Sequence, residues 1–300
     1  MGGFMSIRRT ASIRRTASEV FLDIFIYSAL VMLSIITILP FLQAITISVS
    51  PSSVVSSFGF HILPTRFDFD GYKRIFEYSL IWDAYLNTII RTVAGTALSL
   101  LLYIMGAYPL SKRNLPNRKF WTGIIIFTMY FHGGLIPSYL LVKGLGLYNN
   151  FGALILPGAV STFTLIIVRN FFMTVPQELE ESAKIDGAND IFILFKIVIP
   201  VSLPIIATAA LWSAVANWNA WFDCMLYIKD QNKYVLQYVL RQILLQGQSV
   251  DVQGESQIAY VNTETMKMAA LVVATLPIIC TYPFLQKYFE KGMLVGSVKG

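Results

Sequence analysis

The chain contains six long apolar runs, and few folds are open to a chain built this way. A helix needs about 20 largely apolar residues to cross the hydrocarbon of a bilayer. Hydrophobic residues fill 55% of the 300 positions and charged residues only 13%, whereas soluble domains average roughly 45–50% and about 25%. We therefore predict an all-α integral membrane protein with six transmembrane helices. The predicted spans are 20–49, 88–108, 121–142, 151–168, 201–228 and 268–285.

Basic residues between the runs predict the orientation in the membrane, because short basic loops resist translocation. The Ser111–Lys119 loop, SKRNLPNRK, is such a loop. With both termini in the cytoplasm of a bacterial cell, at its inner membrane, the cytoplasmic segments hold fourteen Lys and Arg and the opposite side holds eight. The net charge of +6 then reflects topology, and we predict no nucleic-acid partner. The cytoplasmic residues are Arg8, Arg9, Arg14, Arg15, Lys112, Arg113, Arg118, Lys119, Arg169, Lys184, Lys196, Lys287, Lys291 and Lys299; the outer ones are Arg66, Lys73, Arg74, Lys143, Lys229, Lys233, Arg241 and Lys267.

A polar leader, residues 1–19, precedes the first run. That run is too long for a signal-peptide core of about 7–15 residues, so we expect a retained helix. The leader repeats SIRRTA at Ser6–Ala11 and Ser12–Ala17, a pattern that resembles a kinase recognition site. A basic leader beside an anionic leaflet explains it more simply.

Residues for catalysis or metal binding are hard to find. The sequence has no phosphate-binding loop, no HExxH and no CxxC, and its two histidines, His61 and His132, lie far apart. Cys224 and Cys280 have no metal-ligand spacing and are expected to be packing residues. We therefore predict no catalytic residue, no metal site and no cofactor bound by this chain. Any energy source must be another subunit.

One charged block, Pro176–Pro200, interrupts the apolar sequence and is expected to face water. Pro176 suits a helix start, acidic residues follow where they oppose the positive helix end, and Gly187 offers a break. We predict two short helices joined at a bend, with Ile191, Leu194, Phe195 and Val198 on the side that faces the bundle. The charged residues of the block are Glu178, Glu180, Glu181, Lys184, Asp186 and Asp190.

This block resembles the EAA signature of permease subunits of ATP-binding-cassette (ABC) importers: EAA, three residues, G, nine residues, I-x-L-P. Glu181–Ala183, Gly187 and Ile197–Pro200 match its spacing, with Ser182 in place of the first Ala and Ile199 in place of Leu. The sequences at 131–150 and 292–300 resemble MalG-like carbohydrate permeases, most of all the LplC-type branch. The flanking residues that fit the sugar-importer version are Pro176, Leu179, Ile185, Asp186 and Ala188.

The resemblance implies a type I ABC importer permease fold with cytoplasmic coupling helices. The expected divisions are a leader at 1–19, a first helix and outer loop at 20–86, a permease core at 87–290 and a tail at 291–300. The implied partners are a second homologous permease in a heterodimer, two ATPase subunits that bind ATP and Mg, an extracytoplasmic solute-binding protein and membrane lipid. The implied activity is inward transport of a carbohydrate, favouring an oligosaccharide, by alternating access.

The resemblance also assigns roles to residues. Those implied in ATPase coupling are Glu178, Glu181, Ser182, Ala183, Asp186, Gly187 and Pro200. In the fifth run a polar and aromatic cluster is a candidate substrate pathway, because polar groups inside a membrane are costly and tend to line cavities. An interfacial aromatic belt with hydrogen bonds between helices explains the cluster equally well. Its members are Asn217, Trp218, Asn219, Trp221 and Asp223.

The outer segment Lys229–Thr265 is long and polar at its centre, and loops beyond about 12–15 residues tend to be functional or disordered. Gln246, Gly247, Gln248 and Ser249 are its candidate contacts with a binding protein, and a passive connection is the alternative. Two other classes stay open at this point: a transporter that works without ATP, and a membrane assembly subunit. The sequence does not identify the sugar.

Overall fold

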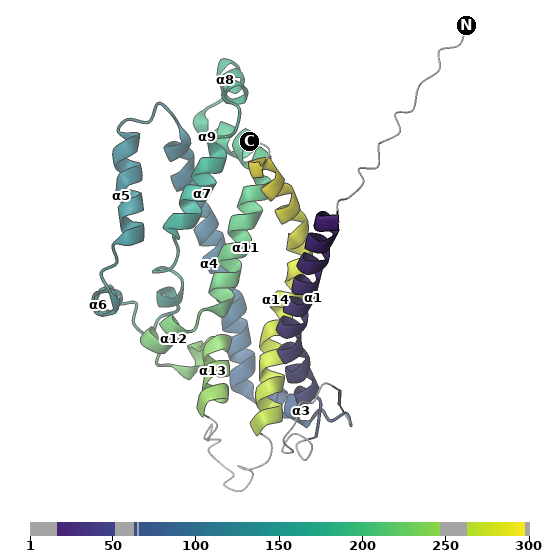
Figure 1. Cartoon of the computed structure of the whole chain (residues 1–300). Coiled ribbons are helices and arrows are strands. Elements are labelled where there is room, and N and C mark those ends of the chain that lie inside the picture. Colours follow the sequence, from purple (N-terminus) through teal and green to yellow (C-terminus); the bar gives the residue numbers. More distant parts are fainter. Residues whose placement is uncertain (1–16, 52–62, 65, 247–262, 298–300) are drawn as a thin grey trace.

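The computed structural model of the chain describes residues 17–51, 63–64, 66–246 and 263–297, and every regular element in these ranges is a helix (Figure 1). The α-helices are α1 (Ala17–Ser48), α3 (Asp70–Glu77), α4 (Ser79–Ser111), α5 (Arg118–Tyr130), α6 (Leu135–Gly144), α7 (Thr162–Phe172), α8 (Gln177–Ile185), α9 (Asp190–Ile193), α10 (Ile199–Val201), α11 (Leu203–Asn219), α12 (Phe222–Tyr227), α13 (Leu236–Gln246) and α14 (Thr263–Ser297). The 3₁₀ helices η1 (Phe151–Leu154) and η3 (Gln231–Lys233) and the π-helix η2 (Leu194–Val198) complete the order.

Three helices in the described part are long and apolar enough to cross a membrane alone, and they lie within α1, α4 and α14. Two further spans arise only if bent pairs are counted: α5 with α6, bent by 110°, and the α9–α10 segment with α11, bent by 83°. The predicted all-α membrane architecture is confirmed. The prediction of six separate spans is not, because the third, fourth and fifth runs are broken.

The third predicted span, 121–142, breaks between Tyr130 and Leu135. Gly134 caps α6 with a φ of +91°, a left-handed conformation that only glycine adopts freely. The fourth, 151–168, begins as the short η1 and becomes α-helical only at Thr162, where the Ser161 hydroxyl accepts from the Thr164 amide at 3.3 Å. Hydropathy averaged over about 20 residues conceals such short breaks.

The centre of the bundle is α4, which packs against α11, α7 and α13 (Figure 1). Its contact with α11 is close because the facing residues are small. A methyl group at Gly95 would lie 2.7 Å from the Asn217 Oδ1 atom, so a larger residue there would displace the Asn217 side chain. Small residues that let helix backbones approach are typical of helix packing in membranes.

The bundle has two ends, which differ in their elements (Figure 1). The α8 end carries α8 and α9, beside an apolar core that contains Tyr108, Phe172 and Val198. The α13 end carries α3, α12 and α13, and its core contains Ile75 and Leu240. Residues 247–262 connect α13 with α14 but lie outside the described residues.

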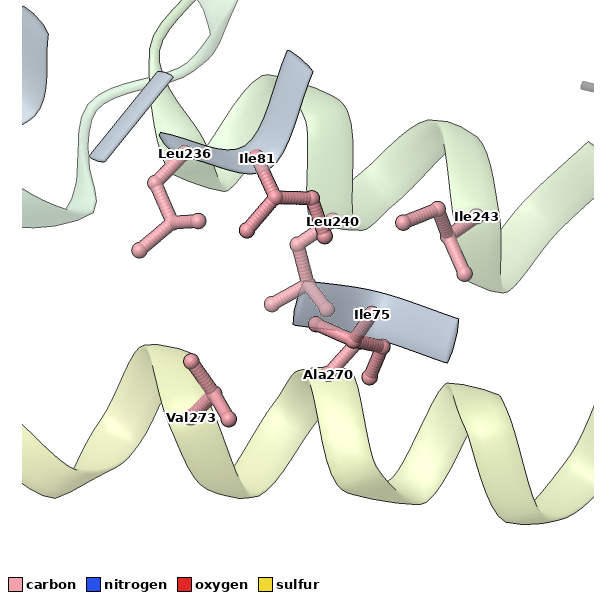
Figure 2. A pocket seen from close by; sticks show the side chains of 7 residues that line it. All are labelled: Ile75, Ile81, Leu236, Leu240, Ile243, Ala270 and Val273. Atoms are coloured by element: carbon pink, nitrogen blue, oxygen red, sulfur yellow. The ribbon is translucent and has the colours of Figure 1, made fainter. Parts of the chain in front are cut away.

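The predicted outer loop is partly helical. Within it, α13 has apolar residues at helical spacing, and Leu236, Val239, Leu240 and Ile243 are buried. Figure 2 shows α13 side chains converging with Ile81 and with residues of α3 and α14 around a small apolar cavity. Its volume is about 10 Å³, roughly the room that one water molecule requires. This cavity is a packing defect and is far too small for a sugar.

Candidate functional site

The charged block folds as two short helices joined at a bend, as predicted. Pro176 caps α8, and Gly187 follows the helix with a φ of +82°. The chain restarts at Asn189, whose Oδ1 atom accepts a hydrogen bond from the Phe192 amide at 2.8 Å. Local signals therefore fix the bend: Gly187 in the left-handed region just after α8, and the Asn189 cap at the start of α9.

Ion pairs fix the block to the bundle and across its own bend. Lys112 follows the last residue of α4 and pairs with Glu180 on α8, and both side chains are largely covered. The Lys112 ammonium also lies 4.0 Å from the centre of the Tyr108 ring, where the ring face attracts a cation. On the surface, Lys184 Nζ lies 3.0 Å from Asp190 Oδ1 across the bend. Pairs as exposed as this one contribute little stability.

The outward surface of α8 combines acidic and apolar side chains. Glu178, Glu181, Ser182 and Asp186 are exposed, and Gln177 donates to Glu181 Oε1 at 2.7 Å. Ile185, the last residue of α8, is 87% exposed. Ala183 and Ala188 face inward against the core of the α8 end. Pro200 lies in α10, where the chain turns toward α11, and is exposed.

The predicted apolar face beyond the bend is half confirmed. Leu194 and Val198 are buried, whereas Ile191 and Phe195 are exposed. The reason lies in the π-helix η2, which spans Leu194–Val198. A π-helical turn holds more residues than an α-helical turn, so the spacing expected for an α-helix does not hold there. The exposed pair adds to the apolar surface at the α8 end.

At the α13 end, the predicted polar and aromatic cluster separates into groups with different surroundings. Asn217 packs against Gly95 and donates to the Ser213 carbonyl at 2.9 Å. Trp218 is 8% exposed and donates to the Ala274 carbonyl at 3.2 Å. Packing accounts for both. Asn219 is exposed and donates to the Val215 carbonyl of its own helix at 3.0 Å.

Asp223 has a partner that sequence reasoning missed. Arg91 on α4 is 3% exposed and holds the Asp223 carboxylate through both terminal nitrogens, with its Nη1 atom 3.1 Å from Asp223 Oδ1. The same nitrogen donates to the Ala220 carbonyl at 3.2 Å, where α11 has ended. A single Arg and a single Asp in separate apolar runs were the available signal, since charges in such runs tend to pair.

The predicted binding-protein contacts cannot be placed together. Gln246 is the last residue of α13, whereas Gly247, Gln248 and Ser249 lie outside the described residues, as do the leader residues 1–16. The assignment of these residues stays a prediction.

The sequence matches a known transporter family over nearly its full length. Residues 1–295 match the family model described as binding-protein-dependent transport system inner membrane component. The chain therefore belongs to this family of permease subunits of ABC importers, and it is a transport protein of the membrane rather than an enzyme.

Curated relatives and solved structures agree with this membership. The chain is 45% identical over 280 residues to the polygalacturonan/rhamnogalacturonan transport system permease protein YtcP of Bacillus subtilis, covering 93% of this chain and 98% of YtcP. It is 46% identical over 266 residues to the protein LplC of the same species, covering 88% of this chain and 90% of LplC.

Among solved structures, the chain resembles one from a bacterial ABC transporter involved in the import of the acidic polysaccharide alginate. The TM-score is 0.85 at 32% identity, and the alignment covers 93% of this chain and 100% of that one. A second chain, from an alginate ABC transporter in complex with a periplasmic protein that holds an alginate pentasaccharide, has a TM-score of 0.58 at 16% identity and shares the fold.

Proposed function

We propose that this permease subunit imports oligosaccharides derived from acidic polysaccharides. The support comes from relatives that cover nearly the whole chain. One at 45% identity carries polygalacturonan and rhamnogalacturonan in its name, and a structure at 32% identity comes from an alginate importer. All three polysaccharides contain uronic acids, so the proposed cargo carries carboxylates.

The proposed assembly contains a second homologous permease, two ATPase subunits that bind ATP and Mg, and an extracytoplasmic solute-binding protein. The α8 end faces the cytoplasm with both termini, and the α13 end faces the binding protein. The distribution of basic residues supports this orientation, because the short loop after α4 and the first turn of α5 carry Lys112, Arg113, Arg118 and Lys119 on the proposed cytoplasmic side.

The observation that carries the coupling proposal is the exposed apolar tip of α8. Ile185 is 87% exposed at the end of a helix that projects from the bundle (Figure 1). An apolar side chain so exposed beside carboxylates suits a protein interface, where the apolar centre is surrounded by a polar rim. We propose that an ATPase subunit covers it.

Movement of such a docked ATPase has two routes into the bundle. One runs through the Lys112–Glu180 pair to α4. The other runs past the bend to the buried Leu194 and Val198 and on to α11. Both α4 and α11 pass through the centre of the molecule. A short rigid segment at the α8 end can therefore convert movement of the ATPase into a rocking motion of the bundle.

Co-purification and uptake test this function together. Ile185→Asp in the full complex should reduce the ATPase retained per permease by about tenfold, since a charge replaces the centre of an apolar contact. Asn114→Asp is the matched control, because Asn114 is exposed in the loop after α4, where the same charge is added away from α8. Equal retention in both variants would contradict docking at α8. Failure of the wild-type complex to import any uronate oligosaccharide would contradict the proposed cargo.

A further inference from the structure

A tryptophan and an arginine from different elements stack on each other at the α13 end. The Arg241 Cζ atom lies 3.8 Å from the centre of the Trp221 ring. Trp221 comes from the junction of α11 and α12, and Arg241 comes from α13. A guanidinium that stacks through its flat face keeps its N–H donors in its own plane, free for another group.

The Arg241 side chain is exposed and has no acidic partner among the described residues, in ion pairs or in hydrogen bonds. Two other cations at this end, Arg91 and Lys233, differ from it. Arg91 is held by Asp223, and Lys233 lies 3.5 Å from Asp230 Oδ2 and donates to the Asn149 carbonyl at 3.0 Å. Within the described part of the chain, Arg241 is therefore a cation without a carboxylate partner, and an aromatic ring lies against it.

Both halves of the stack are anchored to α4, so its geometry exists before any ligand arrives. Arg91 binds Ala220 and Asp223, the residues on either side of the Trp221–Phe222 pair. The Thr88 hydroxyl, one turn earlier on α4, accepts a hydrogen bond at 2.8 Å from the amide of Leu236, the first residue of α13. A site held by such supporting contacts loses little freedom on binding.

We infer that Trp221 and Arg241 form a contact for the carboxylated sugar rings of the cargo as they enter the permease. A guanidinium fork matches a carboxylate in geometry and charge. The indole is half-buried beneath the guanidinium and adds apolar surface beside it for the C–H groups of the same sugar ring. This inference rests on the proposed function, because it requires a cargo with carboxylates. It adds the subsite that would bind these carboxylates.

The test is uptake of an oligogalacturonide trimer into liposomes that contain the full complex, with the loaded binding protein at saturating concentration. Arg241→Gln should lower the maximal rate by about five- to tenfold, since one charge-assisted contact is lost. Arg241→Glu should lower it further, because repulsion replaces attraction. Arg241→Lys should fall between Gln and wild type, because it keeps the charge without the fork. Lys229→Gln, which removes an exposed cation from the same end, should stay within about twofold.

The outcomes separate this contact from its alternatives. An unchanged maximal rate in Arg241→Gln, or equal rates in the Gln and Glu variants, would overturn the inference. A rise only in the concentration of binding protein needed for half-maximal uptake would also overturn it, since Arg241 would then contact the binding protein. Trp221→Phe should keep most of the rate and Trp221→Ala should lose it. Wild-type complex that imports no uronate trimer at all would instead contradict the proposed function.

Discussion

Lys112, which caps α4, pairs with Glu180 of α8 while its ammonium lies against the ring of Tyr108. The side chains of Lys112 and Glu180 retain 23% and 13% of their exposure. The pair is thus shielded better than a surface ion pair, and it joins the projecting helix to the central helix of the bundle. It is the one place where the described part of α8 is tied to α4 by charge.

Reversing one charge of this pair should weaken coupling. Lys112→Glu or Glu180→Lys removes a contact of about 1 kcal/mol and adds repulsion, so uptake per ATP hydrolysed should fall at least roughly fivefold. The double reversal should recover much of the loss, because it restores the attraction. Lys184→Glu, in the exposed pair with Asp190, is the control and should change the ratio little. No recovery in the double variant would contradict a direct Lys112–Glu180 link.

Gly187 should matter through its backbone alone. Its φ is +82°, and a methyl group built on it would meet nothing within 4 Å, so substitution causes strain without a clash. Gly187→Ala should cost about 1–2 kcal/mol and distort the bend, lowering uptake per ATP. Gly187→Asn should cost less, because asparagine tolerates this conformation. Gly144→Ala, which also meets nothing but lies in a helix, should be neutral. Equal activity of the Ala and Asn variants would contradict the strain argument.

The Arg91–Asp223 pair predicts an order of stabilities. Asp223→Asn leaves a guanidinium buried without its counter-charge, which costs about 3–5 kcal/mol. Arg91→Met leaves a carboxylate whose side chain is already 27% exposed, so water can stabilise it and the cost is smaller. The double variant should be more stable than Asp223→Asn. Thermal unfolding of the purified complex measures these stabilities. If Arg91→Met were less stable than Asp223→Asn, the conclusion that Arg91 is the more deeply buried partner would be contradicted.

The sequence alone predicts features that depend on neighbouring residues. The short helix α8 follows from Pro176 and an acidic first turn, and the bend after it follows from Gly187. Long apolar runs likewise predict α1, α4 and α14. These predictions were confirmed because each element is determined by residues that are close to one another in the sequence.

Features that depend on distant residues could not be predicted in this way. Arg91 and Asp223 are 132 positions apart, and only the fold brings them together. Trp218 and Trp221 look alike in sequence, yet one is buried against Ala274 and the other stacks under Arg241. The break at Gly134 and the helix α13 were missed because hydropathy over a long window averages out a short break and a polar connection conceals an amphipathic helix.

Impermeant labelling should determine the orientation. In a background without Cys224 and Cys280, a cysteine in place of Asn114, which is exposed in the loop after α4, should label only after the membrane is opened. A cysteine in place of Lys229, exposed near the α13 end, should label in intact cells. The expectation rests on the excess of basic residues in the short loop after α4. Labelling of position 114 in intact cells would reverse the topology.

The connection between α13 and α14 should be dispensable for folding but not for transport. Residues 247–262 lie outside the described residues, yet their anchors pack together, since Leu240 and Ile243 of α13 share a core with Ala270 of α14. Deleting 248–254 leaves nine residues between Gln246 and Thr263, which can reach about 30 Å. Assembly and basal ATPase activity should therefore persist. Uptake per assembled complex should fall several-fold with saturating binding protein, because the removed residues are polar and belong to a long connection on the side proposed to meet that protein. Replacing the same seven positions with a Gly/Ser sequence of equal length separates the two explanations. Recovery with this sequence would make the segment a spacer, whereas continued loss would make its side chains a contact.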